Sequence, residues 1–233
     1  FSLSFFINLA TYSCKTEQPV YWDVLTIDEN NNGIEADMTY PYRFGGNEKI
    51  SAIINDKIAQ TLVSPLCEDT MSDSISIDSM LNFLTIEKQK DTILNRVPYQ
   101  LNSSCDVYTT DKFTSVMLSV YYFTGGANGY SNVCYLNFDN KTGKIIPIED
   151  LIDFTPELLQ EVRKKFCIVR DISLDTPASE ATMFVAPAEL PFPKEIGFSS
   201  QGVVFYYNLY EVGPRYAGDT EVVIPFDKVI SHF

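Results

Sequence analysis

Few side chains in this sequence are placed to do acid–base or metal chemistry. The single histidine, His232, lies next to the C-terminal residue. A Ser-His-Asp triad, a Cys-His pair and a His-ligated zinc site all need an imidazole inside the site. The five cysteines are widely spaced and form no CxxC pair, which disfavours a metal knuckle or a redox pair. We therefore expect neither a metal nor a cofactor.

Paired carboxylates are the remaining route to catalysis, because a glycoside hydrolase needs two of them at a fixed separation. Two acidic groups lie close together in the sequence: Glu149, Asp150 and Asp153, and Glu211, Asp219 and Glu221. Their spacing marks none of them as catalytic, and a solvated charge is the usual state of such residues. We expect no enzyme, and the alternative is a wall-active, carboxylate-dependent glycan hydrolase.

A glycine-rich turn is the first candidate binding segment. Gly125, Gly126, Asn128 and Gly129 follow an apolar stretch. Glycines bring backbone N–H groups together and let a ligand approach closely, and the Asn128 amide could both donate and accept hydrogen bonds. The alternative is a sharp turn between two buried strands, which needs glycine only for its positive φ.

A cluster of aromatic and polar residues near the C-terminus is the second candidate. Its members are Tyr206, Tyr207, Asn208, Tyr210, Glu211 and Tyr216. Tyrosines beside amide and carboxylate groups stack on sugars or anchor a protein partner. The alternative is a strand with Tyr206 or Tyr207 in the core. We expect a loop over 208–218 whose aromatic side chains are partly exposed.

Composition excludes several classes of partner. The 233 residues are 45% hydrophobic, enough for a packed core, and carry a net charge of −14. Nucleic acids and anionic membrane surfaces require clustered Lys and Arg, so neither is expected as a direct partner. An acidic surface favours basic partners.

The first ten residues, FSLSFFINLA, are apolar but too few to span a bilayer as a helix. They resemble the apolar region of a secretory signal, with Cys14 as the lipidated first residue of the mature protein. A buried N-terminal strand is the alternative. We expect an extracytoplasmic protein of the bacterial cell envelope that contacts the membrane only through this lipid. The remaining four cysteines, Cys67, Cys105, Cys134 and Cys167, then form two disulfides or remain buried thiols.

Strands and helices occur in blocks, which predicts an α+β fold: two small α/β subdomains, each a mostly antiparallel sheet with helices on one face. We expect a signal and linker over 1–19, one domain over 20–130 and a second over 131–233. Helices are predicted from Asn47 to a stop at Pro65, along one face from Ile77 to Leu84, and after Thr155-Pro156. Strands are predicted over 20–27, 35–42, 99–108, 113–124, 130–138, 145–152, 196–199, 202–207 and 221–226.

Two signatures in this sequence resemble a known family. The segment Tyr121–Gly129, YYFTGGANG, is similar to the YYxTGGAHG signature of RsiV-like and PdaC-like extracytoplasmic domains. The segment Gly202–Val212, GVVFYYNLYEV, is similar to their GLVFYFNPYEI. Asn128 replaces the histidine of the first signature, so a function of that imidazole does not carry over.

The resemblance implies a non-catalytic extracytoplasmic module with a smaller N-terminal partner domain. In RsiV the module is the outer part of an anti-sigma factor that binds lysozyme, and in PdaC it precedes a peptidoglycan deacetylase. Neither the deacetylase nor the sigma-binding segment is matched here. We therefore expect a binding module that recognises an envelope protein such as lysozyme, or a cell-wall glycan.

Overall fold

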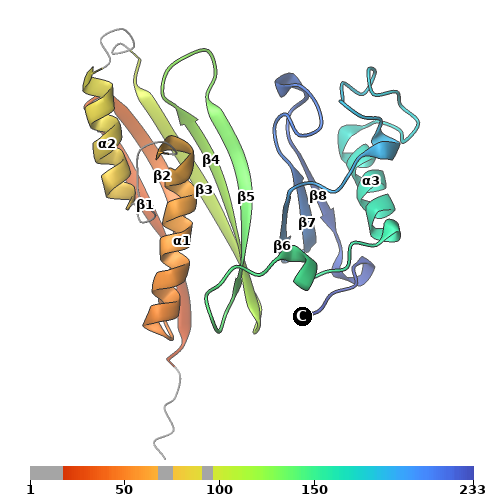
Figure 1. Ribbon diagram of the computed structural model, residues 1–233, viewed down its shortest axis with the longest axis horizontal. Coiled ribbons are helices and arrows are strands. Elements are labelled where there is room, and N and C mark those ends of the chain that lie inside the picture. Colours follow the sequence, from red (N-terminus) through yellow and green to blue (C-terminus); the bar gives the residue numbers. More distant parts are fainter. Residues whose placement is uncertain (1–17, 68–75, 91–96) are drawn as a thin grey trace, which may run out of the picture.

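Residues 18–67, 76–90 and 97–233 of a computed structural model are described here, and they form two units, each with its own sheet (Figure 1). The first unit is a five-stranded sheet with two helices, and the second is a three-stranded sheet with one. This confirms the expected α+β class. The predicted signal segment and Cys14 lie outside the described residues. Within those residues, no helix is both long enough and apolar enough to cross a membrane.

The first unit begins with a long hairpin. Strand β1 (Val20–Asn31) pairs antiparallel with β2 (Ile34–Gly45). Asn32 and Gly33 connect them with positive φ angles of 50° and 79°, which matches the right-handed twist of the two strands. In the part of the chain that the structure describes, no strand pairs with the other edge of β1, and most of the side chains of β1 are exposed.

Helix α1 (Glu48–Cys67) follows, and the Asn47 side chain accepts a hydrogen bond from the Lys49 N–H at 3.0 Å. The predicted stop at Pro65 is wrong, because the helix continues through it to its end at Cys67. Proline removes one helical N–H, but here it does so only in the last turn. The Thr61 carbonyl, which Pro65 cannot bond, instead accepts the Ser64 hydroxyl at 3.4 Å.

Helix α2 (Ile77–Lys90) leads to strands β3 (Tyr99–Thr109), β4 (Phe113–Phe123) and β5 (Tyr130–Asp139). The sheet order is β1-β2-β3-β4-β5, and all pairs are antiparallel except β2–β3. That parallel pair requires a long crossover, which the two helices provide. The first sheet extends to Asp139, past the domain boundary expected at residue 130.

The two faces of the first sheet differ. Alternate residues of β4, from Val116 to Tyr122, pack against both helices. The Tyr122 hydroxyl lies in this core and donates to the Leu62 carbonyl of α1 at 2.6 Å. On the opposite face, Phe113 packs against Phe198 of the second unit, with ring centroids 4.7 Å apart. The helices thus cover one face and the second unit covers part of the other.

The second unit starts with a short 3-10 helix at Ile148–Asp150, where the sequence predicted extended chain. Thr155 caps α3 (Pro156–Arg170) by accepting the Leu158 N–H at 3.1 Å, as its Thr-Pro start predicted. The antiparallel sheet that follows contains β6 (Glu195–Ser199), β7 (Gly202–Tyr207) and β8 (Thr220–Ile224). Val162 and Phe166 of α3 share a core with alternate residues of β7. Three further 3-10 helices occur at Pro187–Glu189, Arg215–Ala217 and Phe226–Lys228.

The cysteine side chains that the structure describes are free thiols: Cys105, Cys134 and Cys167. Cys105 and Cys134 both lie level with Leu118, one on each side of β4. Two strand spacings separate their Cα atoms by about 10 Å, beyond the ~7 Å that a disulfide spans. These two residues therefore cannot pair in the folded protein.

We expect Cys134 to resist alkylation in the native protein. Burial raises the pKa of its thiol to about 12, with the nearby Glu195 charge adding to the effect, so little reactive thiolate forms at pH 8. Mass spectrometry after iodoacetamide treatment, with and without urea, measures this protection. Equal labelling under both conditions, or a Cys105–Cys134 disulfide, would contradict this arrangement of strands.

Candidate functional site

The two segments predicted as binding sites come together at one end of the molecule. The Arg215 guanidinium, between β7 and β8, donates to the Gly129 carbonyl of the glycine-rich turn at 3.1 Å. A third loop, after α3, joins them where the Phe184 N–H donates to the Val212 carbonyl at 2.8 Å. We call these three segments, 124–129, 171–194 and 208–219, the loop end; they lie at the top of Figure 1.

Asn208 anchors the loop end to the first sheet. Its side-chain amide donates to the Val133 carbonyl and accepts from the Val133 N–H, both at 2.8 Å. Val133 lies on β5, the edge strand of the five-stranded sheet. The Asn208 side chain therefore makes the pair of hydrogen bonds that a sixth strand would make at this position.

Two glutamates make further hydrogen bonds at the junction, the place where the second unit meets β5 of the first sheet. Glu211 accepts the N–H groups of Lys194 and Asn208 at 2.8 and 2.9 Å, so both of its carboxylate oxygens are engaged. Glu195 accepts the Tyr135 N–H of β5 at 2.9 Å. Burial raises the pKa of Glu195, the Tyr135 N–H opposes this, and the Glu211 charge adds to it. The predicted site residues Asn208 and Glu211 thus hold backbone in place.

The two adjacent tyrosines of β7 have different surroundings. Tyr207 is fully buried, donates from its hydroxyl to the Pro191 carbonyl at 2.8 Å and packs edge-on against Phe166. A ligand therefore cannot reach Tyr207 in this structure. Tyr206 is less buried, and its hydroxyl bonds to the Asp219 carboxylate. Burial and that carboxylate both raise the pKa of Tyr206.

Three aromatic side chains of the loop end are exposed to solvent: Tyr210 by 58%, Phe184 by 61% and Tyr216 by 83%. Tyr210 and Thr182 have positive φ angles of 65° and 57°, an uncommon conformation for non-glycine residues and a strained one for threonine. A Cβ on Gly213 would come within 2.4 Å of the Thr182 carbonyl oxygen, so these two loops pack closely. The exposed rings therefore project from a tightly fixed backbone.

The glycine-rich turn combines an open position with a covered one. Gly125 and Gly126 have φ angles of 101° and 95°, which favour glycine. The side of Gly126 where a Cβ would point is open, whereas the Tyr121 ring covers Gly129. Asn128 is exposed. Two of the predicted binding residues, Gly126 and Asn128, thus face solvent.

The carboxylates considered for catalysis are not gathered into one site. Asp153 contacts His232 at 2.9 Å, and Glu211 binds backbone at the loop end. Among the described residues, no group of three or more His, Cys, Asp or Glu side chains could hold a metal ion.

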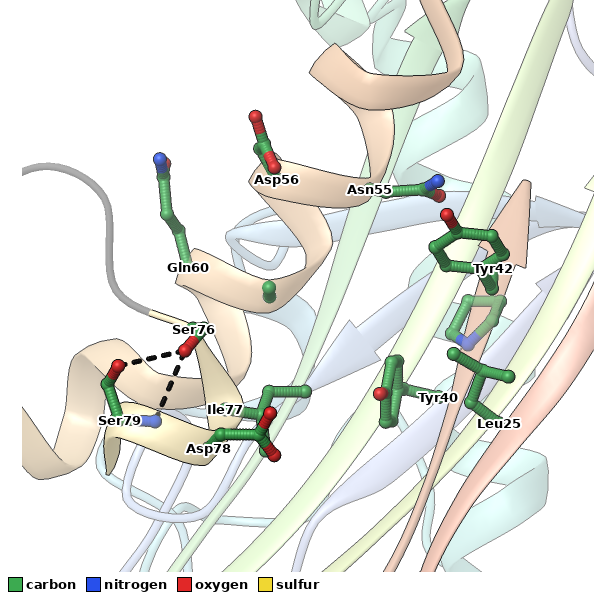
Figure 2. A pocket seen from close by; sticks show the side chains of 12 residues that line it. Leu25, Tyr40, Tyr42, Asn55, Asp56, Gln60, Ser76, Ile77, Asp78 and Ser79 are labelled. Carbon is green, nitrogen blue, oxygen red and sulfur yellow. Dashed lines mark hydrogen bonds between the residues drawn. The ribbon is translucent and has the colours of Figure 1, made fainter. Parts of the chain in front are cut away.

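A pocket that the sequence did not predict lies in the first unit. It has a volume of about 420 Å³ and lies between β1, β2 and the helices α1 and α2 (Figure 2). The side chains that line it are Leu25, Tyr40, Pro41, Tyr42, Asn55, Asp56, Ala59, Gln60, Ser76, Ile77, Asp78 and Ser79. In the sequence, the one feature that points to this pocket is the pair of tyrosines two residues apart on β2, Tyr40 and Tyr42.

Family comparisons assign different families to the two parts of the chain, and the first match ends at residue 131, near the start of β5. Residues 27–131 match the family described as "Deacetylase PdaC". Residues 150–227 match the family described as "Protein of unknown function (DUF3298)". The chain therefore carries an N-terminal PdaC domain followed by a DUF3298 domain, which confirms the family resemblance of its two signatures.

Solved structures show the same fold. A DUF3298 family protein from Bacteroides fragilis aligns over 91% of this chain and 92% of its own, with a TM-score of 0.67 and 14% identity. A DUF3298 family protein from Pseudomonas aeruginosa aligns over 91% and 90%, with a TM-score of 0.58 and 14% identity. No curated protein matches the chain.

We expect Asn208→Ala to destabilise the protein by about 2 kcal/mol, since it removes two backbone hydrogen bonds worth about 1 kcal/mol each. The free energy of urea unfolding measures the loss. Asn30→Ala, at an exposed asparagine of β1, is the matched control and should stay near wild type. Equal stability of the two variants would show that Asn208 does not secure the junction.

Glu195→Gln should stabilise the protein at neutral pH. The raised pKa means that the folded state binds a proton at Glu195 more readily than the unfolded state does. Wild type therefore loses stability as pH rises through that pKa, whereas glutamine keeps an acceptor for Tyr135 without a charge. Thermal unfolding from pH 4 to pH 8 should show a gain that grows with pH.

Glu180→Gln, on the exposed loop after α3, controls for the loss of one negative charge. If Glu195→Gln lowered stability at pH 7, the partly buried charge of Glu195 would stabilise the contact with β5 and our account would be wrong.

Proposed function

We propose that this chain is a non-catalytic, extracytoplasmic binding module that recognises a basic protein of the cell envelope, such as a lysozyme, through the loop end. The observation that carries the proposal is a set of exposed aromatic rings on a backbone that partly buried hydrogen bonds hold in place. Tyr210, Tyr216 and Phe184 supply the rings. Asn208 and Arg215 tie the loops that carry the tyrosines to the first unit.

Rigid aromatic anchors are well suited to protein recognition. Tyrosine is enriched among the residues that dominate binding energy, because it buries a large area and loses few degrees of freedom. A fixed loop also avoids the entropic cost of ordering on binding. The backbone strain at Tyr210 and Thr182 supports this proposal, since such strain gathers at functional sites.

Charge favours a basic partner. The chain has 31 acidic and 17 basic residues, so it attracts cationic proteins and repels anionic ones. We name lysozyme as the basic partner because this sequence resembles RsiV-like domains. The apolar N-terminal segment and Cys14 support the proposal that the module is lipid-anchored outside the cytoplasm.

The alternative is a wall-active hydrolase that uses two carboxylates. Both oxygens of Glu211 already accept backbone N–H groups, which argues against a catalytic function for that residue. Incubation with peptidoglycan and chitin oligomers, followed by mass analysis of the products, tests the alternative. Turnover that disappears in Glu211→Gln or Asp150→Asn would replace our proposal with an enzymatic one.

We expect Tyr216→Ala to weaken binding to a basic chicken-type lysozyme by about tenfold or more, since a central aromatic anchor contributes ~2 kcal/mol. Calorimetric titration of the purified chain measures the affinity. Binding should also weaken as salt rises, because charge attraction between exposed surfaces is screened. Tyr210→Ala should act in the same direction.

Tyr21→Ala is the matched control, since Tyr21 is also an exposed tyrosine but lies on β1 of the first unit. Circular dichroism confirms the fold of each variant. No lysozyme binding by wild type, or equal binding by Tyr216→Ala, Tyr210→Ala and the control, would reject the loop end as the lysozyme site.

A further inference from the structure

The pocket of the first unit has two chemically different walls. Leu25, Tyr40, Pro41 and Tyr42 form an apolar and aromatic wall on the hairpin β1–β2. Polar side chains from α1 and from the start of α2 form the other wall and the rim (Figure 2). Its volume of about 420 Å³ falls within the range of pockets that take small molecules.

Several polar groups of the pocket are available to a ligand. Within the described part of the chain, no hydrogen bond or ion pair engages the carboxylates of Asp56 and Asp78. The hydroxyl of Tyr40 points from β2 toward the start of α2, where Asp78 lies (Figure 2). Tyr40 and Asp78 line the same pocket. Burial raises the pKa of Tyr40, and the charge of Asp78 adds to the effect.

Other polar groups in the pocket are structural. The Asn55 amide binds the N–H and the carbonyl of Arg43, both at 2.8 Å, and so fixes α1 against β2. The Ser76 hydroxyl accepts the Ser79 N–H at 3.2 Å and caps α2. These bonds hold both polar elements in place, so the pocket is formed before a ligand binds.

The charges of the lining select the ligand. Among the residues that the structure describes, the lining includes two carboxylates and no lysine, arginine or histidine, so its charges disfavour a phosphate or a carboxylate. Aromatic rings on one side and hydroxyl, amide and carboxylate groups on the other match a ring with apolar faces and a hydroxyl-bearing edge. Pyranose sugars have this shape, and an amino group would pair with Asp78.

We propose that this pocket binds a hexosamine unit that carries no acidic group, with the sugar ring against Tyr42 and its hydroxyl or amino groups on Asp78 and Tyr40. The proposal stands independently of lysozyme recognition, because it concerns a different unit and different residues. It assigns to the PdaC domain a ligand site of its own, distinct from the loop end.

Titration calorimetry with glucosamine and N-acetylglucosamine tetramers tests the proposal. We expect saturable binding of at least one of them. Tyr42→Ala should weaken it by about tenfold or more through the loss of the aromatic contact with the sugar ring. Asp78→Asn should have an effect of similar size through the loss of a hydrogen bond to a charged group. The two sugars separate a requirement for a free amine from a requirement for hydroxyl groups alone.

Tyr21→Ala controls for the loss of an exposed tyrosine from the same hairpin, and N-acetylmuramic acid controls for charge. Tyr42 and Asp78 are both exposed, so their variants should fold. No saturable binding up to millimolar sugar, full affinity in both variants, or equal affinity for N-acetylmuramic acid would each overturn the proposal. Lysozyme titrations of the same samples report on the loop end separately.

Discussion

The structure depends on how the outer edge of β5 is closed. An edge strand presents N–H and C=O groups that must find partners, and in this protein the second unit supplies them. Asn208 bonds both backbone groups of Val133, and Glu195 accepts the N–H of Tyr135. Nearer the connection between the units, the Ile146 N–H donates to the Asn137 carbonyl at 2.7 Å. Within the loop end, these bonds fix the segments 171–194 and 208–219 relative to the glycine-rich turn, and therefore the orientation of the exposed tyrosines.

A second asparagine side chain also bonds both backbone groups of one strand residue. Where β2 runs past the end of its pairing with β3, the Asn55 amide bonds both backbone groups of Arg43. In each case one asparagine side chain substitutes for a neighbouring strand and joins an element that cannot pair with the sheet. One such bond pair positions α1 beside the pocket, and the other positions the loop end. Both candidate sites thus rely on the geometry of a side-chain amide.

Much of the fold could be predicted because its signals are local. Strand β4 could be predicted because its residues are apolar on both faces, and the start of α3 because Thr155 and Pro156 form a helix-start pattern. Both signals depend on neighbouring residues alone. The burial of Tyr207 was also within reach, since Val203 and Phe205 face the core and Tyr207 continues their alternation. The function of Asn208 could not be predicted from the sequence, because its partner Val133 lies 75 residues away. The pocket was missed for the same reason, since its walls come from separate elements that only the folded chain brings together.

The open edge of β1 has a consequence for association between molecules. Its first eight residues, VYWDVLTI, are rich in residues that favour strands and contain one charge, Asp23. Its last four residues include Asp28 and Glu29, and charged side chains of this kind keep free edges apart. A variant in which both residues are uncharged would present a continuous template for another copy of the same strand. Aggregation of such a variant would then start along the free edge of β1, outside the loop end.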